Sequence, residues 1–263
     1  MTGASMVAIP RRESGLGRRW TKPLAAGLSF ALFGIAVVEL AANLSYVLPP
    51  GDSYLGMDFL FYRDIAARWV ETGAYYLPHQ LAGPYPATLM VVNLYPPPAL
   101  LLFVPFLVLP AILWWVIPIA GLVAFLAWCR PAPVAWPLLA LVLIWPRTQT
   151  AFLFGNTDLW MAAAVAGGLR WGWPAALLVV KPTFLVFAVV GLRRREFWIA
   201  LAALAVVSIP MAALWLDYVQ AMRNVTIDAD YSLGSLPLLL APLVAWFLRT
   251  RSGASLPSTP ALQ

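Results

Sequence analysis

The sequence is poor in charged residues and has almost no cysteine or histidine. Only 11% of its 263 residues are charged, and it contains one cysteine, Cys129, and one histidine, His79. A single cysteine excludes an internal disulfide framework and a cysteine-based metal site. P-loop, G-x-S-x-G and H-E-x-x-H motifs are also absent, which removes common signatures of nucleotide binding, serine hydrolysis and zinc proteolysis.

The sequence is rich in hydrophobic residues. They make up 62% of the chain, and the mean hydropathy is +0.81, unlike the mixed composition of a soluble domain. The run 24–48 provides the ~20 apolar residues that a membrane span needs, and it is too long for the apolar part of a cleaved signal peptide. The sequence therefore predicts an all-α, polytopic integral membrane protein.

Apolar runs recur along the chain and predict about eight helical elements, some of them short or re-entrant. They are 24–48, 97–109, 111–129, 131–146, 156–169, 173–191, 197–216 and 234–248. Neither an internal repeat nor a domain-sized linker separates them. Residues 1–248 are therefore expected to form one membrane domain, and 249–263 a disordered cytoplasmic tail.

The basic residues predict the orientation, because cytoplasmic loops are enriched in lysine and arginine. They gather in residues 1–22, in Arg193–Arg195, and at Arg249 and Arg251. Eight crossings place these groups in the cytoplasm and the loops 49–96 and 217–233 on the extracytoplasmic side, together with Arg130 and Arg170. The net charge of +6 is thus interpreted as a topology signal, and nucleic acid is not an expected partner.

Five charged side chains lie close together in the first outside loop, within GMDFLFYRDIAARWVETGAYYLP (56–78). On a helix over 58–72, Asp58 and Tyr62 share one face, and Asp64 lies on the other. The segment is too polar to span. It predicts an amphipathic helix in the membrane interface, with an aromatic face on which Asp58 is the charged exception.

Asp58 has two interpretations. A carboxylate turned toward a membrane bundle is costly to ionise without a partner, which makes it a candidate functional residue. Aspartate near a helix start is also a common N-cap that binds backbone N–H groups. Spacing leaves both open, whereas Asp52, which follows Pro-Pro-Gly, is typical of a turn.

Lys181 interrupts the apolar stretch LLVVKPTFLVF, and Pro182 can break a helix there. A buried ammonium can hold a lipid phosphate; equally, it can reach the interface or pair with an acid. Glu39, inside the first apolar run, is expected to be a structural partner for a basic residue.

FGNTDLW (154–160) is typical of a helix start. Asn156 or Thr157 is expected to cap the helix, and Asp158 to complement its dipole. Earlier in the chain, the three prolines after Tyr95 stiffen the entry into the second apolar run.

The remaining polar residues give weaker signals. His79 lies in the same loop as Asp58 and could relay protons, contact a substrate or simply be exposed. Asp217, Asp228 and Asp230 form an acidic group in the other outside loop. A divalent cation is possible there but is not indicated, and a solvated loop is the favoured interpretation.

Taken in order, these segments resemble the GT-C membrane glycosyltransferases, most closely the glycosyltransferase family 87 type, which includes polyprenyl-phosphate-mannose-dependent α-mannosyltransferases. The resemblance rests on DFLFYRDIAARWVETGAYY (58–76), YPPPALLLFVPFLVLP (95–110), GNTDLW (155–160) and VVKPTFLVFAVVGLRRREFW (179–198). GNTDLW stands where the family often has Gly-Gln-x-Asn. Family members usually continue for several helices more.

The resemblance implies transfer of a mannose-like sugar from a polyprenyl phosphate donor to a hydroxyl of a lipid or glycan acceptor, at the outer face of a bacterial inner membrane. By this resemblance Asp58 is the general base, and Lys181 or Arg63 supplies positive charge to the leaving phosphate. The candidate substrate-binding residues are Tyr62, Arg63, His79, Tyr95, Asn156 and Lys181. No cofactor is expected.

Two other hypotheses stay open. A transporter or lipid-handling protein would use the intramembrane charges for passage, and would favour charges along a common path and an internal repeat. A truncated, non-catalytic relative would act as an assembly partner, and Asp58→Asn would then leave the cellular phenotype intact.

Overall fold

The computed structural model of the chain describes residues 15–48, 54–87, 92–226 and 233–250. Its α-helices are α1 (Gly15–Val47), α2 (Met57–Thr72), α3 (Pro78–Ala82), α4 (Leu100–Phe103), α5 (Leu113–Cys129), α6 (Ala135–Ile144), α7 (Pro146–Phe154), α8 (Asp158–Trp171), α9 (Arg195–Ser208), α10 (Ala212–Asn224) and α11 (Leu236–Phe247). Short 3₁₀ helices connect them, namely η1 (Pro97–Ala99), η2 (Val104–Leu107), η3 (Trp173–Val180), η4 (Pro182–Val190), η5 (Ile209–Met211) and η7 (Leu233–Ser235). Two short strands, β1 (Tyr85–Pro86) and β2 (Val225–Thr226), pair in parallel.

Some of the sequence predictions concern residues outside these ranges. They are residues 1–14 of the basic N-terminal group, Asp52, Asp228, Asp230 and the tail from residue 251 onward. The predictions for the described residues can be compared with the structure directly.

Two segments are long and apolar enough to cross a membrane, Thr21–Ser45 within α1 and Arg195–Asn224, which includes α9 and α10. A third arises if α6 and α7, which bend by 64° at their junction, count as one span. The chain therefore has the character of a helical membrane protein. Eight crossings are not found in the described residues, because several apolar runs fold as elements shorter than the ~20 residues of a span.

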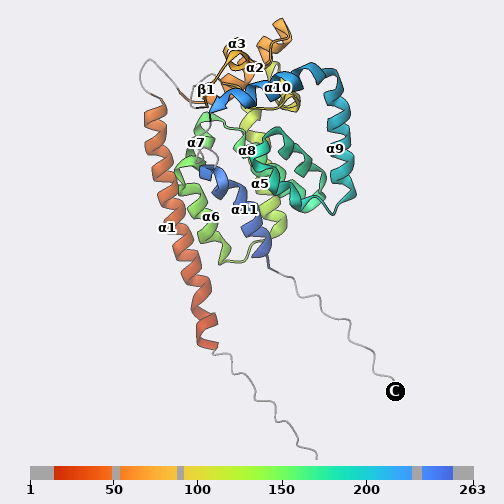
Figure 1. Ribbon diagram of the computed structural model, residues 1–263. Coiled ribbons are helices and arrows are strands. Elements are labelled where there is room, and N and C mark those ends of the chain that lie inside the picture. Colours follow the sequence, from red (N-terminus) through yellow and green to blue (C-terminus); the bar gives the residue numbers. More distant parts are fainter. Residues whose placement is uncertain (1–14, 49–53, 88–91, 227–232, 251–263) are drawn as a thin grey trace, which may run out of the picture.

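The longest helix, α1, lies along the outside of the bundle beside α6 (Figure 1). Many of its apolar side chains are exposed, with Phe30 at 84%, as expected for a helix that lipid rather than protein would cover. Asn43 donates a hydrogen bond to Gln149 in α7 and so fastens α1 to the bundle. Glu39 is exposed on α1, and within the described ranges it forms no ion pair, contrary to its predicted structural role.

An aromatic core forms where α2, α5 and α8 meet. Its centre is Trp114, which is fully buried. Four rings lie with their centroids 4.9–5.5 Å from that of Trp114, those of Phe59, Tyr62, Phe106 and Trp160. The Trp114 indole N–H also donates to the carbonyl of Gly155, 2.7 Å away. These contacts hold the start of α2 against the turn between α7 and α8.

The two ends of the bundle are built from different elements. At one end, α2, α3 and α10 lie together (Figure 1), and the Tyr85 hydroxyl donates to the carbonyl of Ala221 at 2.9 Å. At the other end, α5 and α11 finish side by side, and the Thr250 N–H donates to the carbonyl of Arg130 at 3.1 Å. We call these the α2 end and the arginine end.

The arginine end also contains Arg170 and Arg194. The Arg170 guanidinium lies 4.4 Å from the ring centroid of Trp128 in α5, and the Arg194 side chain packs against Gly172, just after α8. The predicted separation of Arg130 and Arg170 from the basic group at Arg194 is therefore wrong. The physical reason is that the run 173–191 breaks at Lys181, so η3 and η4 form a hairpin that returns to the end it left.

Gly155 is the residue of the core turn that tolerates a side chain least. Its φ is +70°, and an added Cβ would lie 2.6 Å from a ring atom of Trp115. We expect Gly155→Ala to lower the free energy of unfolding by about 1–3 kcal/mol, because alanine is strained at this φ and crowded as well.

The matched control is Gly27→Ala in α1, where an added Cβ meets nothing within 4 Å. This change should be neutral or stabilising, since alanine is the better helix former. Thermal unfolding of both variants in detergent micelles measures the difference. Equal melting temperatures for Gly155→Ala and the wild type would contradict the crowded turn.

Candidate functional site

Polar side chains from two breaks between helices meet a carboxylate at the start of α2. Asp58 lies in the first turn of α2, Asn156 between α7 and α8, and Lys181 between η3 and η4. The Asn156 Nδ2 donates to the Asp58 Oδ2 at 2.6 Å, and its Oδ1 accepts from the Lys181 Nζ at 3.4 Å. One amide thus connects a carboxylate with an ammonium from a distant part of the sequence.

The position of Asp58 follows from how α2 begins. Gly56 is the N-cap with a left-handed φ of 72°, and its N–H donates to the carbonyl of Leu153 at 2.8 Å. No side chain caps α2, so the N-cap interpretation of Asp58 is wrong, and its carboxylate bonds Asn156 instead. The predicted inner face is confirmed by Tyr62, which is 3% exposed.

Lys181 forms a salt bridge with Asp158, the first residue of α8. Asp158 is fully buried, and the Lys181 side chain is 14% exposed. The Ser235 hydroxyl, from η7, donates to the second carboxylate oxygen of Asp158. Of the alternatives for Lys181, pairing with an acid is the one observed, as expected where an uncompensated buried carboxylate would be costly.

A chain of hydroxyl groups continues from Asn156 toward α2. The Thr157 Oγ1 lies 3.5 Å from the Asn156 Oδ1 and 2.8 Å from the Tyr95 hydroxyl, which in turn lies 3.0 Å from that of Tyr62. The Asn156 Oδ1 also accepts the N–H of Asp158, the first residue of α8, at 3.0 Å. The N-cap of α8 is Thr157, and no side chain caps this helix. The predicted capping by an Asn156 or Thr157 side chain is therefore wrong, although the Asn156 Oδ1 binds both Lys181 and the first N–H of α8.

Burial raises the pKa of the Asp58 carboxyl above its ordinary value of 3.8. Loss of solvation is the largest cause, and the hydrogen bond from Asn156 and the positive charges of Lys181 and Arg147 act in the opposite direction. A carboxyl with a raised pKa beside polar partners is typical of groups that exchange protons. Asp58 is thus suited chemically to proton transfer.

Two predicted site residues, Arg63 and His79, are not part of this network. The Arg63 guanidinium lies 5.9 Å from the ring centroid of Phe59, and its Nε has no hydrogen-bond partner within the described ranges. His79 lies on α3, is exposed, and has its ring 5.9 Å from that of Tyr85. The structure thus brings together Asp58, Tyr62, Tyr95, Asn156 and Lys181 of the predicted set.

Sequence reasoning missed three members of the site. Asp158 and Thr157 were expected only to start a helix, and no sequence signal pointed to Ser235. Asp158 could have been found, because an acid and a lysine that both lie within apolar runs each need a partner of opposite charge. Ser235 could not, since a serine next to an apolar run is an ordinary helix start.

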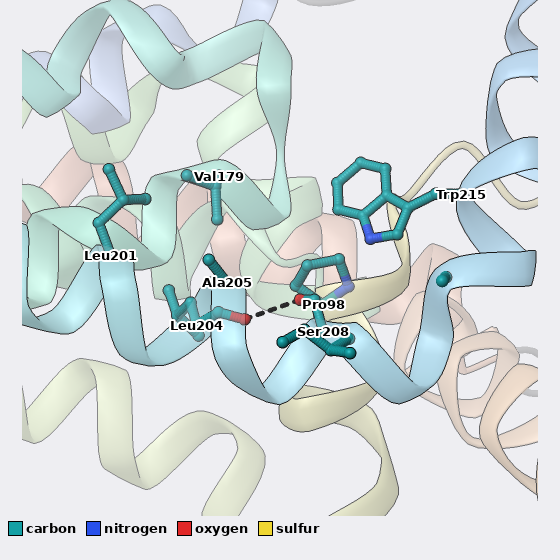
Figure 2. Close-up of a pocket in the computed structure, with 9 residues that line it drawn as sticks. Pro98, Val179, Leu201, Leu204, Ala205, Ser208 and Trp215 are labelled. Atoms are coloured by element: carbon teal, nitrogen blue, oxygen red, sulfur yellow. Dashed lines mark hydrogen bonds between the residues drawn. The ribbon is translucent and has the colours of Figure 1, made fainter.

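An apolar cavity of about 450 Å³ lies between η1, η3 and the segment from α9 to α10 (Figure 2). Pro98 and Val179 line it, and they are close in sequence to Tyr95 and Lys181. Asp58 and Lys181 do not line this cavity. The cavity and the polar network are therefore lined by different residues.

The acidic group of the second outside loop is described only in part, because Asp217 lies on α10 and its two predicted companions lie outside the described ranges. Within those ranges, histidine, cysteine and acidic residues form no cluster of three or more that could hold a metal ion.

The salt bridge between Lys181 and Asp158 gives a stability prediction. Lys181→Met should lower the free energy of unfolding by about 3–5 kcal/mol, because it leaves the buried Asp158 carboxylate without its counter-charge. The double variant Lys181→Met/Asp158→Leu should recover most of the loss, since it removes both charges. Unfolding in detergent micelles measures both. A single variant as stable as the wild type would contradict the pairing.

The raised pKa of Asp58 gives a prediction about pH. In the folded protein this pKa lies above the unfolded value of 3.8, so ionisation of Asp58 opposes folding as the pH rises. Asp58→Asn should therefore melt at a higher temperature than the wild type at pH ~7, and this gain should disappear below the unfolded pKa of 3.8.

Asp64→Asn, the same change on the exposed face of α2, is the control and should show little gain at either pH. Melting temperatures of the three proteins across this pH range provide the measurement. If Asp58→Asn melted below the wild type at neutral pH, the ionised carboxylate would be stabilising and the argument would fail.

Comparison with known proteins finds no relative for this chain. It matches no protein-family model, no curated protein and no solved structure. Its function is therefore inferred from the residues of the site.

Proposed function

We propose that the protein is a membrane glycosyltransferase that moves a mannose-like sugar from a polyprenyl phosphate to the hydroxyl of a lipid or glycan acceptor. The observation that carries this proposal is the convergence of Asp58, Asn156 and Lys181 on one set of hydrogen bonds. Glycosyl transfer needs a base for the acceptor hydroxyl and positive charge for the leaving phosphate. The site supplies both kinds of group.

Asp58 acts as the general base in this mechanism. Asn156 donates to its Oδ2 and holds the carboxylate in place, and Oδ1 takes the proton of the acceptor hydroxyl. The acceptor oxygen forms the new bond to the anomeric carbon as the bond from that carbon to the phosphate oxygen breaks. The electron pair leaves with the polyprenyl phosphate, and the single displacement inverts the anomeric centre.

The positive charges of the site stabilise the phosphate of the donor in this proposal. Lys181 is already paired with Asp158, so its positive charge is largely compensated. Arg147, at the start of α7, is close enough for its charge to lower the pKa of Asp58. In our proposal Lys181 and Arg147 together stabilise the negative charge on the leaving phosphate, because Lys181 alone is outnumbered by the two carboxylates.

The placement of the site suits a lipid-linked donor. The site lies at the start of α2, an amphipathic helix whose exposed face carries Asp64 and Glu71. The segments Thr21–Ser45 and Arg195–Asn224 of the same chain are apolar enough to cross a membrane. A donor with its isoprenoid chain among lipids would present its phosphate at such a boundary. In this proposal the α2 end faces outward from a bacterial inner membrane.

Transfer of radiolabelled sugars from polyprenyl phosphates in membranes tests this function. Asp58→Asn should reduce the rate by about 10²–10⁴-fold, the usual contribution of a general base. Asp64→Asn, on the exposed face of the same helix, should transfer at the wild-type rate. Equal transfer by Asp58→Asn and the wild type would remove the catalytic assignment.

A further inference from the structure

Arginine and tryptophan side chains form a connected group across the ends of α5, α8 and α11. The rings of Trp128 and Trp246 are stacked, with centroids 5.5 Å apart and an interplanar angle of 22°. The Arg170 guanidinium lies 4.4 Å from the Trp128 centroid, and that of Arg249 lies 3.6 Å from the Trp246 centroid. Two cations therefore adjoin one pair of stacked indoles.

Further arginines surround this group at the arginine end. The Arg130 carbonyl accepts the N–H of Thr250, the residue after Arg249. The Arg194 side chain packs against Gly172, which follows the end of α8. Arg193, Arg194 and Arg195 are exposed, with Glu196 as the adjoining acid. The salt bridge observed within the described ranges is that of Lys181 and Asp158, so none of these arginines has an acidic partner there.

Arg170 provides the sharpest indication of a ligand. Its Nη1 is buried but has no hydrogen-bond partner within the described residues. Indole rings cover the guanidinium, those of Trp128 at 4.4 Å and Trp171 at 5.0 Å. At least one donor of this guanidinium is therefore unsatisfied, and phosphate oxygens match a guanidinium in number and geometry.

The surroundings of these arginines favour a lipid as the source of the phosphate. Trp128, Trp171 and Trp198 at this end are 41%, 52% and 54% exposed. Tryptophan is enriched where protein passes from the apolar core of a membrane to its headgroups, and basic pockets between membrane helices bind anionic headgroups. Soluble anions would gain nothing from the exposed indoles.

We propose that the arginine end is a binding surface for anionic phospholipids, with Arg170 and Arg249 in contact with the headgroup phosphate. This surface is independent of the glycosyltransferase proposal, because it lies at the end of the bundle opposite to α2. It also explains why the basic residues collect at one end even though they are spread along the sequence. The lipid would hold the arginine end at the cytoplasmic leaflet.

Titration of the full chain in neutral detergent with phosphatidylglycerol and with phosphatidylcholine, followed by native mass spectrometry, tests this proposal. Phosphatidylglycerol should bind at least about tenfold more tightly. Arg170→Gln and Arg249→Gln should each weaken its binding about fivefold. Arg223→Gln is the matched control, because Arg223 is exposed at the end of α10, at the α2 end, and its loss should leave the affinity unchanged.

The proposal would be overturned by equal affinity for the two lipids, by wild-type affinity in both arginine variants, or by an equal loss in Arg223→Gln. Inorganic phosphate forms a further arm, and it should not displace phosphatidylglycerol at the same concentration. Displacement would assign the site to free phosphate rather than to lipid. If Arg170→Gln does not fold, Arg249→Gln alone decides, since Arg249 lies beyond the end of α11.

Discussion

The candidate site depends on the amide of Asn156, which offers a donor and an acceptor on one rigid group. Its nitrogen donates a hydrogen bond to Asp58, and its oxygen accepts hydrogen bonds from the Lys181 ammonium and the backbone N–H of Asp158. An ionised carboxylate in this position could only accept hydrogen bonds, and a hydroxyl would have to donate and accept through a single oxygen. The start of α2, the start of α8 and the break between η3 and η4 are therefore tied together by one side chain.

Burial gives these contacts their importance. In an apolar helical bundle an unpaired charge is expensive, so the ion pair of Lys181 and Asp158 and the hydroxyl of Ser235 make it possible for polar groups to lie there. Asp58 is the member whose environment opposes ionisation, as its raised pKa shows. A salt-bridged pair beside a carboxyl with a raised pKa is typical of a site for proton transfer.

The breaks in the apolar runs are as important as the runs themselves. The turn at Gly155 and the break before Pro182 interrupt the helices on either side of them. The first interruption places Asn156 in the site, and the second places Lys181 there. The same breaks return the chain to the arginine end, where Arg170 and Arg249 meet around stacked indoles. The breaks in the apolar runs therefore place the polar site at the α2 end and the basic surface at the opposite end.

The sequence by itself determined the helical membrane class and the inner face of α2, because hydrophobicity and the 3.6-residue period are local properties of a chain. It also picked out Asp58 and Lys181, since charged residues among apolar ones require partners. Only the tertiary structure decided that Asp158 and Ser235 are among those partners, and that few of the apolar runs are full spans. Such pairings depend on where long runs break and which distant segments pack together, and no local period encodes either.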